Sequence, residues 1–158
     1  MTINQKYILL LSFLLILSGC SNISLEKEIE LYPNGSKKRE LTYKGNYFQM
    51  ELVKSIDFYS VPQSDDPPKL SEMNYENNSL NGKQEHWYKN GTKKMVLNYR
   101  YGLMHGEQLG WFVNGKNKFK RNYNFGNLDG IQYTYIKNGN LDRKKLYRNG
   151  KLIRIIKD

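Results

Sequence analysis

The feature that most constrains this chain is a 24-residue unit, copied without insertion through its second half. Five kinds of position recur with this spacing over three copies. They are the aromatics Trp87, Trp111 and Tyr135; the pairs Asn90-Gly91, Asn114-Gly115 and Asn138-Gly139; the tyrosines Tyr99, Tyr123 and Tyr147; and two sets of glycines, Gly82, Gly106 and Gly130, then Gly102, Gly126 and Gly150. Features that keep one phase indicate a repeat architecture, in which each unit is stabilised by its neighbours.

Two weaker copies precede the regular ones. The segment from Leu31 to Gly35 is similar to the later aromatic and Asn-Gly segments, and Tyr43 follows Gly35 by eight residues, as Tyr99 follows Gly91. The second weak copy is marked by Phe58-Tyr59 and Tyr75, but residues 60–70 replace its Asn-Gly pair with a proline- and aspartate-rich segment that favours an exposed loop. We expect about five copies, at residues 27–45, 46–81, 82–105, 106–129 and 130–153.

Each copy is expected to form a β-hairpin. Asn and Gly tolerate the positive φ angles of a two-residue type I′ turn. Such a turn at Asn90-Gly91 places Trp87 opposite Lys94, and the same register places Trp111 opposite Lys118. Because side chains alternate along a strand, one face receives Tyr88, Met95, Leu97 and Tyr99, and the other receives Trp87 and Val96. The predicted fold is all-β: an elongated antiparallel meander of stacked 24-residue hairpins, whose last copy carries Arg143 and Lys145 as a polar cap.

The motif W-Y-x-N-G, with its downstream Tyr and Gly, resembles the MORN-repeat variant family of bacteria. The resemblance covers residues 82–150 strongly and residues 27–81 loosely. It implies a scaffold of MORN-like β-hairpin repeats and supplies no catalytic residue. Many members of that family carry the label antitoxin-like, and roles in protein and membrane-lipid association have been proposed for the family at large.

The first twenty residues are typical of an export signal. The uncharged run from Tyr7 to Leu17 is eleven residues long, whereas a membrane-spanning helix needs about 20. It leads into Leu17-Ser18-Gly19-Cys20, which resembles the lipobox of bacterial lipoproteins, and that resemblance implies cleavage before Cys20 and acylation of its thiol. Cys20 is the only cysteine, which excludes an intramolecular disulfide and every multi-cysteine zinc site.

These observations predict four segments. They are a lipoprotein signal peptide (1–19), a tether (20–26), degenerate repeats with the Pro/Asp loop (27–81), and regular repeats with a terminal cap (82–158). The expected location is the cell membrane or the outer membrane, with the lipid-anchored chain facing the periplasm or the exterior.

Charge is distributed unevenly between the two repeat regions. Residues 20–81 hold 7 Lys and Arg against 10 Asp and Glu, whereas residues 82–158 hold 17 against 5. This asymmetry indicates a polyanionic partner: anionic lipid headgroups, an acidic envelope polymer or an acidic protein. The export signal disfavours nucleic acid. The alternative is that the lysines only solvate the sheet and protect its edges from pairing.

The candidate binding residues are Trp87, Trp111, Tyr135, Lys94 and Lys118. Basic and aromatic side chains at a regular step suit a binding surface, with a few aromatic and arginine anchors supplying most of the affinity. Two alternatives remain open. The aromatic rows can serve packing alone, and each Trp–Lys pair can be an internal cation–π contact of about 0.5–1 kcal/mol without any ligand.

The sequence offers little that indicates chemistry. His86 and His105 lie 19 residues apart in different repeat phases, so we expect no metal site. There is no Gly-rich phosphate loop ahead of a helix and no G-x-S-x-G elbow. Acidic pairs such as Glu28/Glu30 and Asp65/Asp66 are expected on the surface. The sequence therefore predicts no catalytic residue and no cofactor, and a protein that is not an enzyme.

Three functional hypotheses follow. The first is a lipid-anchored, non-enzymatic envelope scaffold that binds a protein or an anionic surface. The second is an antitoxin-like or immunity protein that neutralises a toxin at the envelope, which genomic adjacency to a toxin gene would support. The third is an envelope hydrolase, which would require turnover that depends on a Glu or Asp side chain.

Overall fold

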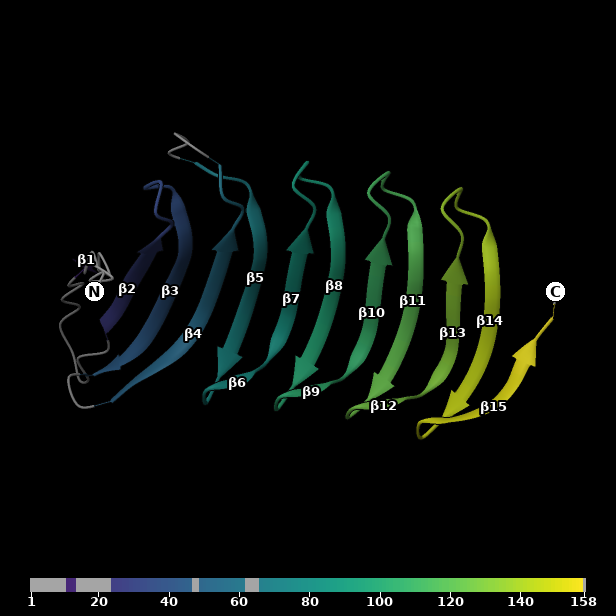
Figure 1. The fold of residues 1–158 in the computed structure, drawn as a ribbon. Coiled ribbons are helices and arrows are strands. Elements are labelled where there is room, and N and C mark those ends of the chain that lie inside the picture. Colours follow the sequence, from purple (N-terminus) through teal and green to yellow (C-terminus); the bar gives the residue numbers. More distant parts are fainter. Residues whose placement is uncertain (1–10, 14–23, 47–48, 62–65, 158) are drawn as a thin grey trace, which may run out of the picture.

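The computed structural model describes residues 11–13, 24–46, 49–61 and 66–157, so Cys20 and most of the expected signal peptide lie outside the described residues. Every regular element in those ranges is a β-strand, and the strands form one open antiparallel sheet (Figure 1). The bounds are β1 (Leu11–Phe13), β2 (Ser24–Leu31), β3 (Lys37–Asn46), β4 (Gln49–Phe58), β5 (Lys69–Glu76), β6 (Ser79–Leu80), β7 (Gly82–Trp87), β8 (Lys93–Arg100), β9 (Leu103–Met104), β10 (Gly106–Trp111), β11 (Asn117–Asn124), β12 (Asn127–Leu128), β13 (Gly130–Tyr135), β14 (Leu141–Arg148) and β15 (Lys151–Ile156).

The strands follow one another in chain order, from β1 to β15, with β6, β9 and β12 paired to β5, β8 and β11 off this path. The predicted all-β antiparallel meander of hairpin repeats is therefore confirmed. Turns lie along two edges (Figure 1). We call the edge with the turns after β2, β7, β10 and β13 the upper edge, and the edge with the turns after β5, β8, β11 and β14 the lower edge.

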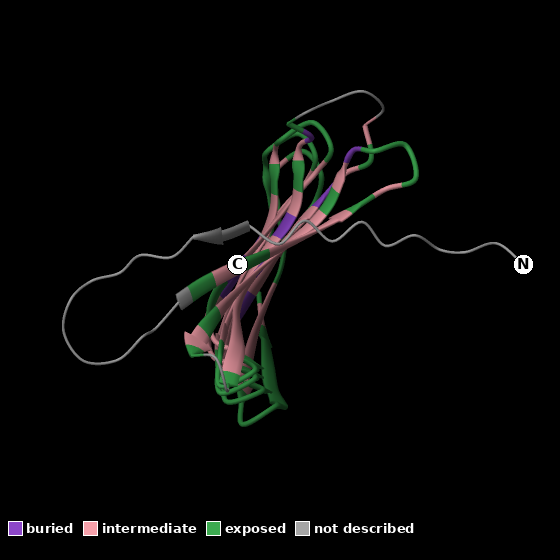
Figure 2. Cartoon of the chain, turned by 90° about the vertical axis from the view of Figure 1, so that its left-hand side faces the viewer, coloured by how far each residue is buried: buried purple, intermediate pink, exposed green. Residues whose placement is uncertain are grey.

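The sheet is a single layer, seen end-on in Figure 2. Among the described residues, Phe58 is the only buried hydrophobic side chain, and most other apolar side chains are half-buried. A single hairpin of this kind is marginal by itself. Each hairpin therefore depends on the hairpins beside it, as expected for a linear repeat array.

The turns of the upper edge differ from the sequence prediction. The peptide N–H of Gly91 donates to the carbonyl of Tyr88, and that of Tyr88 donates to the carbonyl of Thr92, which encloses a three-residue loop. Gly91 has a φ of +80°, whereas Asn90 is not among the positive-φ residues. This is a type I turn with a glycine bulge rather than a type I′ turn. Asn90 serves the turn differently, because its Oδ1 accepts from the N–H of Thr92.

The bulge changes the register. Trp87 pairs with Lys93, not with Lys94, while His86 pairs with Met95 as predicted. The next repeat has the same shift, since Trp111 pairs with Asn117 rather than Lys118. Because the loop has three residues instead of two, the pair next to the turn is shifted by one residue. The bulge takes up this extra residue, so the pairs farther from the turn keep the predicted register.

The type I′ turns lie on the lower edge instead. Four two-residue loops there have positive φ at both positions, again at 24-residue spacing. They are Asn77-Asn78, Tyr101-Gly102, Phe125-Gly126 and Asn149-Gly150. One Asn-Gly pair outside the main phase, Asn149-Gly150, thus forms the turn expected for the pairs within it.

Buried glutamines bridge successive hairpins where their strands diverge. Gln84 and Gln108 are each 1% exposed, and Gln132 is 6% exposed. The Oε1 of Gln108 accepts from the N–H of Asn98 at 2.7 Å, and its Nε2 donates to the carbonyl of Asn98 at 2.8 Å. Gln84 and Gln132 make the same pair of bonds to Asn74 and Asn122. The side-chain amide thereby replaces a peptide group of the neighbouring strand.

A second set of bonds joins the hairpins along their edges. On the upper edge, tyrosine hydroxyls donate to carbonyls of the next hairpin: Tyr59 to Trp87 at 2.9 Å and Tyr88 to Trp111 at 3.0 Å. On the lower edge, the N–H of Gly102 donates to the carbonyl of Leu80 at 2.9 Å. The array is therefore fastened at both edges and near its middle.

The two ends of the sheet differ from the sequence expectation in detail. β2 begins at Ser24, inside the expected tether, and β1 lies inside the expected signal peptide. At the other end β15 covers β14, so Arg143 and Lys145 lie one strand inside the edge. The edge strand itself exposes Leu152, Ile153 and Ile155. The described residues include no helix that is long and apolar enough to cross a bilayer.

Candidate functional site

The register divides the regular repeats into two faces, because directly paired residues point to the same side. The first face carries Gln84 with Leu97 and Gly82 with Tyr99. The second face carries Glu85 with Val96 and Lys83 with Asn98. These assignments agree with the faces predicted for Leu97, Tyr99 and Val96.

Charges on the second face neutralise one another. Glu85 binds Lys93 at 2.6 Å and Lys83 at 3.1 Å, and Glu107 forms an ion pair with Lys120. In the preceding copy Glu72 accepts hydrogen bonds from Lys54 and Lys69, which lower the pKa of its carboxyl group. Each of these acids thus has at least one basic partner. Lys144 on the same face forms no ion pair within the described residues and lies 5.8 Å from the ring centre of Tyr133.

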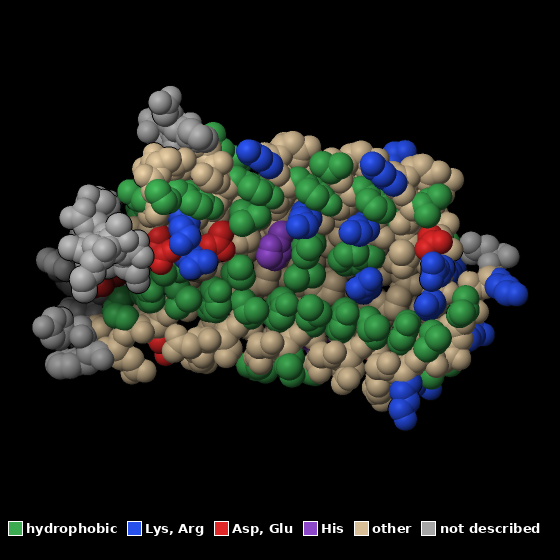
Figure 3. Space-filling model, viewed as in Figure 1, with side chains coloured by type: hydrophobic (Ala, Val, Ile, Leu, Met, Phe, Trp, Pro, Cys, Tyr) green, Lys and Arg blue, Asp and Glu red, His purple; other side chains and the backbone are tan. Residues whose placement is uncertain are grey.

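The first face has the opposite character in its C-terminal part. Lys94, Lys118, Arg121, Arg143 and Lys145 lie on it, and among the described residues only Arg143 has a carboxylate partner, Asp142 at 3.2 Å. Figure 3 shows Lys and Arg side chains between two bands of hydrophobic side chains on this face, with acidic side chains toward the N-terminal end and one acidic side chain beside the basic ones near the C-terminal end. Toward the N-terminal end, Arg39 binds Asp57 at 2.6 Å. The C-terminal part of the first face therefore gathers five basic side chains, of which four have no carboxylate partner among the described residues.

The basic side chains surround a hollow of about 350 Å³ between β11 and β14. Arg121, Arg143 and Lys145 line it, together with Gln132, Thr134 and one acidic residue, Asp142. The guanidinium of Arg121 lies 4.5 Å from the centre of the Phe119 ring, which holds that side chain over the sheet. Phe119 in turn covers Gly110, whose missing side chain leaves room for the ring. We call this site the basic hollow.

His86 occupies the same face two hairpins away. Its half-buried position and the nearby charge of Lys94 lower the pKa of the imidazole, so His86 is neutral at neutral pH. His105 lies elsewhere, at the lower edge, where its ring centre is 4.4 Å from that of Phe125. Among the described residues, no group of three or more His, Cys, Asp or Glu side chains could hold a metal ion.

The structure separates the candidate residues predicted from sequence. Trp87, Trp111 and Tyr135 lie on the second face, whereas Lys94 and Lys118 lie on the first. The predicted Trp–Lys pairs are therefore wrong. Lys94 lies 5.7 Å from the ring centre of Tyr88, and Lys118 lies 5.7 Å from that of Phe112. Trp87 instead takes Lys69 as its cationic neighbour, at 5.8 Å.

Known proteins supply no further assignment. No protein-family model matches this chain. A comparison with curated proteins found no match either. The resemblance to the MORN-repeat variant family stays a prediction, and the site has to be interpreted from its own chemistry.

Sequence reasoning missed the basic hollow and the buried glutamines that bridge the hairpins. Gln84, Gln108 and Gln132 repeat every 24 residues in the same phase as the aromatics, so the signal was present. An isolated Gln in a strand is usually exposed, however, and the repeat period alone does not show that it is buried. Arg121 and Lys145 lie 24 residues apart at one repeat position, whereas Arg143 occupies the position equivalent to Phe119. Only the pairing of β11, β13 and β14 shows that the three side chains lie close together on one face.

Proposed function

We propose that this protein is a lipid-anchored, non-enzymatic scaffold of the cell envelope that binds an anionic polymer or an acidic protein surface through its first face. Cys20 would carry the lipid, and the chain would face the periplasm or the exterior. The basic hollow would be the centre of binding, and Lys94 and Lys118 would extend it along the sheet. The exported location leaves envelope polymers and envelope proteins as the available polyanions.

The observation that carries this proposal is the contrast between the two faces. Cations that already have carboxylate partners gain little from an external anion. Arg121 and Lys145 form no ion pair within the described residues and flank a hollow, and the carboxylate that also lines it, Asp142, is paired with Arg143. The hollow therefore has cations left over to bind an incoming anionic group. Arginine also offers a planar fork that binds phosphate or carboxylate oxygens in pairs.

We expect removal of the charges around the basic hollow to weaken anion binding at least tenfold. The variant is Arg121→Gln, Arg143→Gln and Lys145→Gln in one chain, measured by titration with inorganic polyphosphate of defined length. A lysine near an anionic surface contributes about 1 kcal/mol, so three lost charges allow this effect or a larger one. Binding by the unchanged protein should weaken as salt is added, because screening reduces the attraction.

The matched control places the same charge change on the second face. Lys83→Gln, Lys93→Gln and Lys120→Gln lower the net charge equally but remove cations that are already paired. This control should retain binding within about threefold. Equal losses in both variants would mean that only net charge matters, and the basic hollow would then have no role as a site.

A further inference from the structure

Two aromatic residues hold the chain in a conformation that suits them poorly. Tyr101 has a φ of +53° and Phe125 a φ of +42°, each at the first position of a lower-edge turn. The left-handed region disfavours bulky L-residues, whereas Asn adopts it readily. Asn stands at the equivalent position in the two flanking turns, Asn77 and Asn149. The aromatics at 101 and 125 therefore carry a conformational cost that the two flanking turns avoid.

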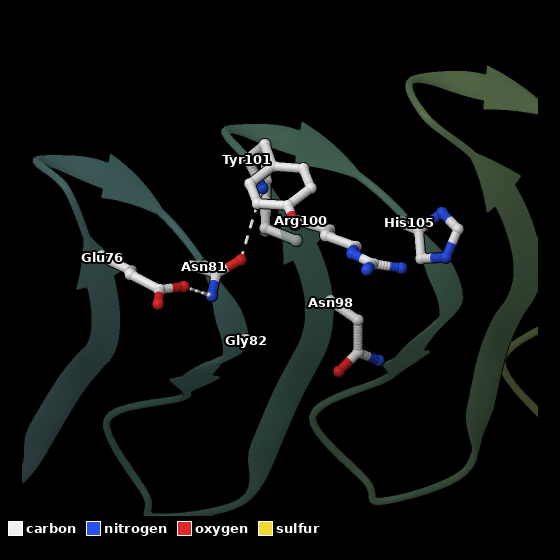
Figure 4. Close-up of a pocket in the computed structure, with 8 residues that line it drawn as sticks. Glu76, Asn81, Gly82, Asn98, Arg100, Tyr101 and His105 are labelled. Atoms are coloured by element: carbon white, nitrogen blue, oxygen red, sulfur yellow. Dashed lines mark hydrogen bonds between the residues drawn. The ribbon is translucent and has the colours of Figure 1, made fainter.

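Both aromatics are exposed at the turns, although Phe125 also packs against the ring of His105. Tyr101 is 68% exposed, Phe125 42% and their neighbour Leu103 48%. The guanidinium of Arg100 lies between the two rings, 5.3 Å from the centre of Tyr101 and 5.9 Å from that of Phe125. Figure 4 shows Arg100 and Tyr101 beside one another at the turn, with His105 on the next hairpin. We call Arg100, Tyr101, Leu103 and Phe125 the turn-tip cluster.

The turn-tip cluster lies on the edge from which the described repeat region begins. β2 starts at Ser24 on the lower edge, and Cys20 is four residues earlier in the sequence (Figure 1). Four residues span at most about 14 Å. Neighbouring strands are about 4.8 Å apart, which places Tyr101 and Phe125 roughly 24 and 34 Å along the edge from β2. A lipid at Cys20 and the turn-tip cluster would therefore meet the same plane at two separated points.

We propose that the turn-tip cluster is a second membrane contact, which inserts into the interfacial layer of the bilayer and holds the sheet upright on its lower edge. The inference rests on the proposed lipid anchor at Cys20. Tyrosine suits this layer because its ring can be buried while its hydroxyl stays at the headgroup level, and arginine extends its charge to the same level. Phenylalanine contributes an apolar ring that gains free energy on leaving water. A single anchor would let the sheet rotate, whereas a second contact fixes its orientation.

The near-zero net charge of the lower edge is compatible with contact between this edge and the bilayer. The lower-edge segments between Glu76 and Lys151 hold Arg100, Arg148 and Lys151 against Glu76 and Asp129, which is close to balance. Insertion would therefore not require anionic lipid. The basic hollow lies nearer the middle of the strands, and β8 alone is about 27 Å long. An upright sheet would keep the first face clear of the bilayer and open to a polymer or protein of the envelope.

The test uses the acylated full-length protein in vesicles of phosphatidylcholine. The variant Tyr101→Asn with Phe125→Asn removes both rings and introduces the residue that the flanking turns already contain. Amide hydrogen exchange is measured at residues 103–105 and 127–129, which lie beside the substituted positions. We expect exchange there to be at least fivefold faster in the variant. The variant also loses the contact between Phe125 and His105, which would speed exchange with or without vesicles. Only a difference that appears on adding vesicles therefore reports the loss of bilayer contact.

Val113→Asn with Ile136→Asn is the matched control, because it removes two exposed apolar side chains from the upper edge. It should leave exchange at the lower edge unchanged. Equal exchange in the unchanged protein and the turn-tip variant would overturn the second contact. A difference that appears only when envelope proteins are added would also overturn it, because a protein would then be the partner.

Mass spectrometry of Cys20 separates this inference from the proposed anchor. If Cys20 is acylated but the unchanged protein and the turn-tip variant exchange at equal rates, only the second membrane contact is contradicted. A chain without an acyl group at Cys20 contradicts the anchor and, with it, the two-point attachment. Insertion should also persist in high salt, unlike polyphosphate binding at the basic hollow.

Discussion

Replacing Gln108 by Leu should lower the free energy of unfolding by about 3 kcal/mol, a large effect for one substitution. Leu fills a similar volume but offers no polar atom. The N–H of Asn98 would lose its only hydrogen-bond acceptor in the structure, while its carbonyl would keep the N–H of His105. A buried donor without a partner costs about 1–3 kcal/mol, and the lost bonds to Asn98 and Gly106 add to this cost.

Losing the Gln108 hydrogen bonds should also weaken the coupling between the repeats on either side of the junction between β8 and β10. The pairing of β8 with β10 includes only Leu109 with Val96 and Gly110 with Met95, so Gln108 supplies a large part of that junction. Trp87 and Trp111 lie on opposite sides of it. We expect denaturant unfolding, followed by tryptophan fluorescence, to change from one transition to two, as nearest-neighbour coupling in a repeat array weakens.

Two control variants test whether the lost hydrogen bonds of Gln108 cause the decrease in stability. Gln49 is exposed, so Gln49→Leu should change stability by less than about 0.5 kcal/mol. Gln108→Glu keeps an acceptor for the N–H of Asn98 but removes the donated bonds, and its stability should recover partly once the pH is low enough to protonate the new carboxylate. If Gln108→Leu unfolds like the unchanged protein, the glutamine bridges do not hold the hairpins together.

Replacing Gly110 by Thr should cost about 2 kcal/mol, in the range of overpacked cores. A Cβ at Gly110 would lie 2.3 Å from a ring carbon of Phe119, so the ring must leave its place. Thr is the residue at the equivalent position 134, which shows that the repeat itself accepts it. The clash therefore arises from Phe119 and not from the backbone of Gly110.

A second substitution tests that explanation. Met95 is the counterpart of Phe119 in the preceding repeat, and a methionine is flexible enough to bend away from a new methyl group. Phe119→Met should restore most of the stability lost in Gly110→Thr, as measured by a double-mutant cycle in denaturant unfolding. Since Arg121 lies over the Phe119 ring, Gly110→Thr alone should also weaken polyphosphate binding. Additive losses in the double variant would contradict direct contact between the two positions.

The local turn chemistry shows where sequence reasoning fails. Asn-Gly was assigned to a type I′ turn because both residues tolerate positive φ, and the assignment was wrong at Asn90-Gly91 but fits Asn149-Gly150. The dipeptide is compatible with either turn. The number of loop residues between the last paired positions decides the type, and that number depends on how the strands align.

The consequence extends to the candidate site. A one-residue shift next to the turn separated Lys94 from Trp87, and so the predicted binding residues divided between two faces. The conformation at Tyr101 and Phe125 was equally hidden, because neither residue type signals a type I′ turn.

The period, the hairpin unit and the antiparallel order of the sheet follow from the sequence alone, because a repeated pattern of apolar and turn residues constrains every copy in the same way. The excess of positive charge in residues 82–158 is equally visible in the sequence. Where that charge acts depends on strand pairing in the folded protein. An ion pair forms only where neighbouring strands place opposite charges on the same side, so Lys93 and Lys120 are paired with carboxylates while Arg121 and Lys145 form no ion pair within the described residues.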